Sequence, residues 1–128
     1  MRQLVYKSDA EPGLGSDDVF QIVQTSATNN AKDGLTGFLL FRDGSFFQLI
    51  EGESTALDSL LNRLHRDPRH RNIAVLDDSG IDARAFGQWR MKRLRDDSAQ
   101  QALADVAPEI PDEGRRAKVV ALVERFYA

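Results

Sequence analysis

The chain has 128 residues, 41% of them hydrophobic and 29% charged, which is typical of one soluble globular domain. Its 17 basic and 20 acidic residues give a formal net charge of -3, and this mild acidity argues against a nucleic-acid-binding face, which is normally basic. The absence of cysteine excludes disulfides, thiolate metal sites and cysteine nucleophiles.

The first expected element is a short strand at Leu4–Tyr6, which Pro12 and Gly13 end. Ser16 or Asp17 can then cap a helix. This helix is expected to end near Asn29–Asn30, before Gly34. Its apolar face is formed by residues at helical spacing: Val19, Ile22, Val23 and Ala27.

A β-hairpin should follow the first helix. Leu35–Phe41 is an apolar run of strand length, Asp43-Gly44 is a strong turn signal, and Ser45–Glu51 is the return strand. The return strand alternates between two faces, with Phe46, Gln48 and Ile50 on one and Phe47 and Leu49 on the other. Because both faces carry large apolar groups, both sides of the sheet should be covered.

A second amphipathic helix is expected where leucines recur at helical spacing: Leu57, Leu60, Leu61 and Leu64. Asp67-Pro68 should stop this helix. Two further strands are expected near Ile73–Leu76 and Trp89–Leu94. The order is β-α-β-β-α-β with an extra fifth strand, so we expect a ferredoxin-like α+β fold.

The last part of the chain predicts two helices, near Ala99–Val106 and Glu113–Tyr127. The second helix has an apolar stripe of Val119, Leu122, Val123 and Phe126. That stripe is expected to cover the sheet face opposite the first two helices. We therefore expect a globular domain over residues 1–95 and a packed helical tail over residues 96–128. The sequence has no signal peptide and no transmembrane-length apolar run, which predicts a cytoplasmic protein without membrane contact.

One polar constellation stands out from these apolar elements. In a ferredoxin-like sheet the first and third strands are neighbours, so Tyr6 and Gln48 should be adjacent on the same face. Asn29 and Asn30 lie at the end of the first helix, beside that face. Tyr6 and Gln48 could simply satisfy each other, and the asparagines could cap the helix. A planar ligand with carbonyl and ring-nitrogen edges would satisfy all four together.

Other kinds of site have little support in the sequence. There is no Gly-rich phosphate loop and no triad order. His65 and His70 lie close together but have no spaced third ligand, so we expect no metal site.

Six short segments carry a family resemblance when taken in order: Leu4–Ser8, Thr25–Asn30, Gly34–Leu40, Phe47–Gly52, Arg66–His70 and Trp89–Met91. They resemble successive signatures of the BLUF family of flavin-binding blue-light receptors. The resemblance implies a flavin cofactor. FAD is usual in this family, and FMN is the alternative. The resemblance also implies that the domain is a sensor and not an enzyme.

The resemblance further implies a role for particular residues. Tyr6 and Gln48 would be the photoactive pair, with Gln48 bridging Tyr6 and the flavin. The other implied cofactor contacts are Ile22 and Leu64 as a sandwich around the ring, Asn29 and Asn30 at its carbonyl edge, and Arg63, Asp67 and more weakly Arg69 and His70 on the phosphate side. Trp89 and Met91 would form the switching strand near Gln48.

The implied mechanism is a transfer of an electron and a proton from Tyr6 to the excited flavin, followed by recombination. Gln48 is left as a rotated or tautomeric amide, and a new hydrogen bond to the flavin shifts its absorption to the red. The sequence departs from the family at Arg90, where a small residue is usual. Since strand side chains alternate, Arg90 should point away from Trp89 and Met91.

Two other functions fit the same fold plan. One is an RNA-binding module, with Tyr6 and Phe46 or Phe47 as base-stacking residues. The other is an interaction module without flavin. A flavin-dependent catalyst has less support, because no substrate-side acid or base is evident. The expected partners of a sensor are the flavin, an unidentified downstream protein and a second copy of the chain in a homodimer or higher oligomer, with no nucleic acid.

Overall fold

The protein is described by a computed structural model that covers residues 1–13, 15–94 and 98–128, without the side chains of residues 16, 17, 19, 20, 23 and 26. In chain order the elements are β1 (Arg2–Ala10), α1 (Ser16–Lys32), β2 (Thr36–Arg42), β3 (Ser45–Gly52), α2 (Ser54–Arg66), β4 (His70–Gly80), β5 (Arg90–Arg93), α3 (Ala99–Val106), the 3-10 turn η1 (Ala107–Glu109) and α4 (Glu113–Tyr127). Within the described residues, no helix is long and apolar enough to cross a membrane.

The strands form one sheet in the order β4-β1-β3-β2-β5. β1 lies between β3 and β4 and is antiparallel to both, while β5 joins the edge of β2 in parallel. This arrangement confirms the predicted ferredoxin-like plan with a fifth strand. It also confirms that β1 and β3 are neighbours, which is the condition for a site that spans them.

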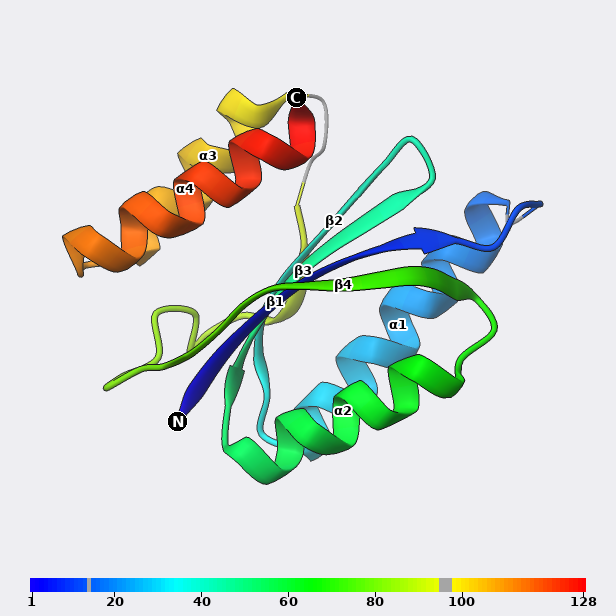
Figure 1. Cartoon of the computed structure of the whole chain (residues 1–128), viewed down its shortest axis with the longest axis horizontal. Coiled ribbons are helices and arrows are strands. Elements are labelled where there is room, and N and C mark those ends of the chain that lie inside the picture. Colours follow the sequence, from blue (N-terminus) through cyan, green and yellow to red (C-terminus); the bar gives the residue numbers. More distant parts are fainter. Residues whose placement is uncertain (14, 95–97) are drawn as a thin grey trace.

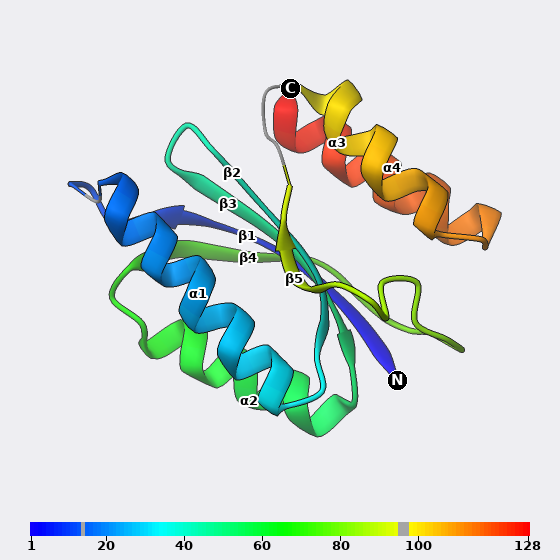
Figure 2. The same cartoon turned by 180° about the vertical axis from the view of Figure 1, so that it is seen from behind.

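Helices cover both faces of the sheet, as the alternation along β3 predicts. α1 and α2 lie on one face, and α3 and α4 lie on the other (Figures 1 and 2). The core is accordingly split into two clusters of buried apolar side chains. The α1/α2 face includes Leu4, Tyr6, Ile22, Leu39, Phe46, Ile50, Leu57, Leu64 and Met91. The α3/α4 face includes Val5, Phe38, Phe47, Leu49, Phe86, Val106, Val119 and Val123.

The β2–β3 hairpin depends on glycine at two positions. Asp43 and Gly44 both have positive φ, 50° and 79°, as a two-residue hairpin turn requires. Gly37 in β2 has φ 151°, and a Cβ atom there would lie 1.8 Å from the carbonyl oxygen of Leu49. Only glycine therefore allows β2 to approach β3 so closely at this point.

The first helix differs from its prediction at both ends. Its N-cap is Gly15, not Ser16 or Asp17, and the Asp18 carboxylate accepts a hydrogen bond from the Gly15 N–H at 2.9 Å. The helix continues to Lys32 and ends where Gly34 adopts φ 70°. Asn29 and Asn30 consequently lie inside its last turn and do not close it. The side chains of Val19 and Val23, which were expected on its apolar face, are outside the described part.

The outer strands also differ in length from their predictions. β1 and β4 run for 9 and 11 residues because they pair with each other from Arg2↔Gly80 to Ala10↔His70. Backbone pairing does not require an apolar pattern. The strands predicted from the apolar runs Leu4–Tyr6 and Ile73–Leu76 were therefore shorter than the observed strands. The two tail helices begin and end as predicted, and Val119 and Val123 are fully buried against the sheet.

Candidate functional site

Tyr6 and Gln48 face each other across the two central strands. They are direct partners in the antiparallel β1–β3 register, and the Tyr6 hydroxyl donates a hydrogen bond to Gln48 Oε1. Their exposed fractions are 2% and 3%. The predicted adjacency is thus confirmed, and with Oε1 engaged the Gln48 amide group is left to donate to another acceptor.

Burial keeps the Tyr6 phenol protonated. Removal from water raises the pKa of Tyr6 well above its usual range, and the negative charge of Asp67 adds to this effect. A neutral tyrosine is a hydrogen-bond donor. Tyr6 therefore keeps its hydroxyl proton and donates it in the hydrogen bond to Gln48.

Asn30 presents a buried amide without a partner. Its side chain is fully buried, and neither Nδ2 nor Oδ1 has a hydrogen-bond partner in the described part of the protein. An unsatisfied buried polar group costs about 1–3 kcal/mol, so a structure that retains one calls for an explanation. A flat ring with adjacent carbonyl and N–H groups would satisfy both atoms at once.

Asn30 lies at a cleft between α1 and α2, one wall of which is Tyr6. Residues from both helices and from the start of β4 line the cleft: Tyr6, Thr25, Asn29, Asn30, Leu60, Arg63, Leu64, Asp67, Arg69 and His70. Its volume is about 70 Å³, well below the several hundred Å³ of a cofactor pocket. A tricyclic ring would therefore require α1 and α2 to move apart, although the polar groups already converge on one place.

The apolar walls expected for a ring are present in part. Leu64 is buried and lines the cleft. Ile22 is buried in the same core cluster as Tyr6 and Leu64, but it does not line the cleft itself.

The cleft entrance is charged, and its charges are paired. Arg63 forms an ion pair with Asp33 at 2.9 Å. The Asp67 carboxylate accepts hydrogen bonds from the Arg69 guanidinium, the shortest at 2.7 Å, and these bonds lower the pKa of Asp67. Both arginines can contact a phosphate only by leaving or sharing their carboxylates.

The two histidines have different surroundings. The His70 ring is 2.9 Å from Ser8 Oγ and packs on Phe46 with ring centroids 4.8 Å apart. Burial lowers the pKa of His70, although the nearby Asp67 opposes the shift. His70 lines the cleft as a largely neutral ring, whereas His65 is exposed on α2.

Trp89 and Met91 do not share a face, contrary to the expected alternation. Trp89 precedes β5 and packs in the α3/α4 cluster, while Met91 is buried in the α1/α2 cluster with Tyr6. The cause is a β-bulge: the register passes from Gly37↔Arg90 to Phe38↔Lys92, and Met91 has φ 61°. The segment therefore links the two cores, and only Met91 lies on the Tyr6–Gln48 side.

Two lining residues were missed by the sequence analysis. Thr25 and Leu60 both line the cleft. Thr25 lies one helical turn before Asn29 and Leu60 one turn before Leu64, so the helical spacing of the recognised residues was a signal that could have identified them.

A second polar centre lies on the opposite face of β3. The Glu51 carboxylate is fully buried and accepts hydrogen bonds from Thr36 Oγ1 and from the backbone N–H groups of Ala85 and Phe86, at 2.7–2.9 Å. Arg115 of α4 completes the set with an ion pair at 2.7 Å. Glu51 thus joins β3 to the β4–β5 connection and to α4.

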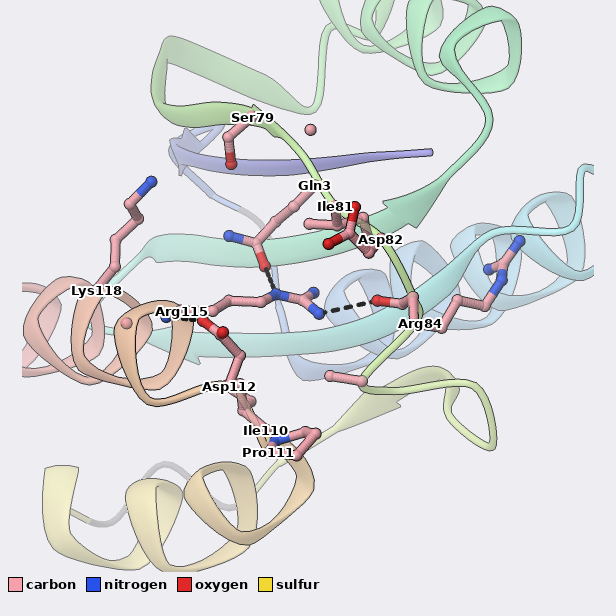
Figure 3. Close-up of a pocket in the computed structure, with 14 residues that line it drawn as sticks. Gln3, Ser79, Ile81, Asp82, Arg84, Ile110, Pro111, Asp112, Arg115 and Lys118 are labelled. Carbon is pink, nitrogen blue, oxygen red and sulfur yellow. Dashed lines mark hydrogen bonds between the residues drawn. The ribbon is translucent and has the colours of Figure 1, made fainter.

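Arg115 also spans a hollow of about 380 Å³ between the end of β4 and the start of α4 (Figure 3). It donates hydrogen bonds to Gln3 Oε1 at 2.6 Å and to the Ala83 carbonyl at 3.3 Å. Each of the three guanidinium nitrogens therefore bonds to the protein, and the charge of Arg115 is paired with Glu51.

The burial of the aromatic side chains argues against RNA binding. A base-stacking module exposes its aromatic residues on an open sheet face. Here Tyr6, Phe46 and Phe47 are at most 2% exposed, because helices cover both faces.

Comparison with known proteins identifies relatives over most of the chain. The family model described as BLUF, sensors of blue-light using FAD, matches residues 1–92. The photoactivated adenylate cyclase subunit alpha of Euglena gracilis is 34% identical over 94 residues, which are 72% of this chain and 9% of that protein. The chain spans only 9–12% of the length of the cyclase subunits that it matches.

Solved structures show the same similarity. The structure of BlrP1 BLUF has a TM-score of 0.83 and 28% identity over 99% of this chain and 89% of its own. Klebsiella pneumoniae BlrP1 with FMN and cyclic diGMP has a TM-score of 0.80 and 28% identity over 95% of this chain and 34% of its own.

Proposed function

The chain belongs to the BLUF family of flavin-binding blue-light sensors, and on that premise we propose that its flavin binds in the cleft between α1 and α2, with Tyr6 and Gln48 as the photoactive pair. The observation that carries this proposal is the coincidence of the hydrogen-bonded Tyr6–Gln48 pair with the unpartnered, fully buried amide of Asn30. Tyr6 and Asn30 both line this cleft, and Gln48 is hydrogen-bonded to Tyr6 behind it, so the buried amides of Asn30 and Gln48 have remaining donors and acceptors that a ligand could satisfy.

The bound flavin supplies light absorption and an electron-accepting excited state, while the protein supplies orientation and protons. Tyr6 holds the proton that moves, because its buried phenol is neutral and bonded to Gln48. Gln48 is the group that can change state, since rotation of its amide exchanges a donor for an acceptor on both sides. Asn30 holds the ring edge in place, with Asn29 beside it.

We assign FAD as the resident flavin, with FMN as the alternative. The family description names FAD, whereas one similar structure is described with FMN. Arg63, Asp67, Arg69 and His70 at the cleft entrance are the groups that would meet the ribityl-phosphate portion. Release of the flavin by heat, followed by chromatography against both standards, distinguishes the two cofactors.

The domain acts as a sensor, and its output is proposed to be a change in protein contacts. The proposed sensor comprises residues 1–95, and residues 96–128 form its tail, with the boundary in residues that are not described. α3 and α4 share a core with the sheet, so a change in the sheet can reach them. We expect the downstream partner to be a protein and the chain to form a homodimer or higher oligomer, which sedimentation in darkness and in light would test.

Replacing Gln48 tests the relay. Gln48→Leu should fold, because Leu suits a position surrounded by Phe46 and Ile50 on the same strand face. We expect the variant to bind flavin, to show an altered dark spectrum and to lose the light-induced red shift. Difference spectra before and after blue light measure this. An unchanged photocycle would mean that Gln48 is only a core residue.

Replacing Asn30 tests the binding cleft. Asn30→Ala removes a directional contact worth about 0.5–1.5 kcal/mol, so flavin affinity should fall several-fold without vanishing. The flavin-to-protein absorbance ratio after dialysis measures the loss. Asn62→Ala, an exposed position on α2, is the matched control and should retain wild-type occupancy. Equal occupancy in both variants would exclude the proposed contact.

A further inference from the structure

β5 is an edge strand with an unusual set of cations. Arg90, Lys92 and Arg93 are all exposed, and none of them forms an ion pair in the part of the chain that the structure describes. By contrast, Arg71 of β4, the strand at the opposite edge of the sheet, is paired with Glu11. On a chain of net charge -3, β5 is thus a local positive surface.

β5 is also the last strand at one edge of the sheet. Among the residues that the structure describes, it pairs with β2 alone. An edge strand leaves backbone N–H and C=O groups available, and an extended peptide can add to them as a further strand. The cations flank this edge, so an added segment that carries carboxylates would gain both backbone bonds and charge pairing.

This basic edge lies one strand away from Gln48 of the proposed photoactive pair. Gln48 is opposite Leu39 in the β3–β2 register, and Leu39 is opposite Arg93 in the β2–β5 register. The Leu94 N–H donates to the Leu39 carbonyl at 3.0 Å. One strand therefore separates Gln48 from the basic edge.

Side chains of the β5 segment also link the basic edge to the two cores of the protein. Met91 is buried in the cluster that contains Tyr6. On the other sheet face, Lys92 Nζ lies 4.6 Å from the centroid of the Trp89 ring. A change in packing on either face would move the cations.

From this placement, and resting on the proposed photosensor function, we propose that the β5 edge is a light-dependent docking surface for an acidic segment of a partner protein. A protein partner fits better than a nucleic acid, because duplex binding commonly uses about 6–10 phosphate contacts, and this surface provides three described cations on an acidic chain. The partner segment would carry carboxylates spaced along an extended backbone.

Charged side chains also protect edge strands from indiscriminate pairing. That protective role would be the same in darkness and in light, whereas a docking surface coupled to Gln48 must differ between the two states. An equilibrium shifts only when the two states differ in interaction energy. A difference in binding between light and darkness therefore distinguishes a docking surface from a merely protective set of charges.

The test uses the full chain loaded with flavin and a fluorescein-labelled octapeptide in which glutamate alternates with threonine. Fluorescence anisotropy measures binding in darkness and under blue light, and absorbance of the same sample records the red shift. We expect the two affinities to differ by at least about five-fold. A single-stranded oligonucleotide of equal charge is the competing probe, and tighter binding of that probe would overturn the proposal.

Two charge-matched variants locate the surface. Arg90→Gln/Lys92→Gln/Arg93→Gln should weaken peptide binding about ten-fold and leave the red shift intact. Lys32→Gln/Arg66→Gln/Arg125→Gln removes the same charge from exposed positions on three helices and should bind as the wild type does. Equal weakening in both variants, or equal wild-type affinity in light and darkness with a normal red shift, refutes the docking surface alone. Absence of the red shift in the flavin-loaded wild type refutes the proposed function and this inference with it.

Discussion

Tyr6→Phe is expected to bind flavin and to show no reversible red shift. The change removes one hydroxyl from a side chain that is 2% exposed and otherwise packed in the α1/α2 core. The ring is retained, so the fold should be retained as well. The hydroxyl is the donor to Gln48, and its proton is the one that the proposed switch moves.

The measurement is a dark-minus-light difference spectrum, and the expected loss is complete. Tyr127→Phe is a matched control that removes a phenol from the α4 end, far along the chain from the cleft, and it should retain the shift. Because the pKa of Tyr6 is raised, the wild-type shift should also persist to roughly pH 10, where a free tyrosine begins to ionise. A normal red-shifted state in Tyr6→Phe would refute the assignment of Tyr6.

Arg115→Met is expected to destabilise the protein by about 3 kcal/mol or more. The substitution keeps the apolar stem of the side chain but removes the ion-pair partner of the fully buried Glu51 carboxylate. It also removes the bonds to Gln3 and Ala83 across the hollow in Figure 3. Removing one partner of a buried pair costs far more than removing one partner of a surface pair. Urea unfolding of the flavin-loaded protein measures the loss.

A double-mutant cycle gives this prediction a control. In a Glu51→Gln background the charge at β3 is absent, so Arg115→Met should cost clearly less than it does alone. Lys118→Ala removes a neighbouring cation of α4 that is half exposed and paired with Asp77, and it should cost at most about 1 kcal/mol. Equal losses for Arg115→Met in both backgrounds would mean that Glu51 and Arg115 are not energetically coupled.

The two residues also explain how the tail is fixed to the sheet. Glu51 follows Gln48 by three positions on β3 but points to the opposite face, towards α4. Its bonds to Ala85 and Phe86 hold the connection that leads to Trp89 and β5. A displacement of β3 would therefore be felt by α4 and by the β4–β5 connection together.

Local sequence patterns predicted most of the helices and strands, and they predicted the Tyr6–Gln48 contact within the site. Period-two alternation placed Gln48 with Phe46 and Ile50, and the order of elements placed β1 beside β3, so the Tyr6–Gln48 contact followed without coordinates. The tail helices were predicted at their observed bounds, because a helix is specified by residues within a few positions of one another. The family resemblance added the flavin and the expected roles, which no local pattern contains.

The tertiary structure decided what depends on residues far apart in the chain. The Glu51–Arg115 pair joins positions 64 residues apart, and nothing near either residue indicates the other. Trp89 and Met91 lie on opposite faces because a bulge against β2 breaks the alternation that their spacing predicts. Asn30 was expected to help close a helix, yet it lies inside the last turn as a buried amide with no hydrogen-bond partner among the described residues. Strand register, burial and contacts between distant residues are set by the packing of whole elements, which the periodicity of a single segment cannot determine.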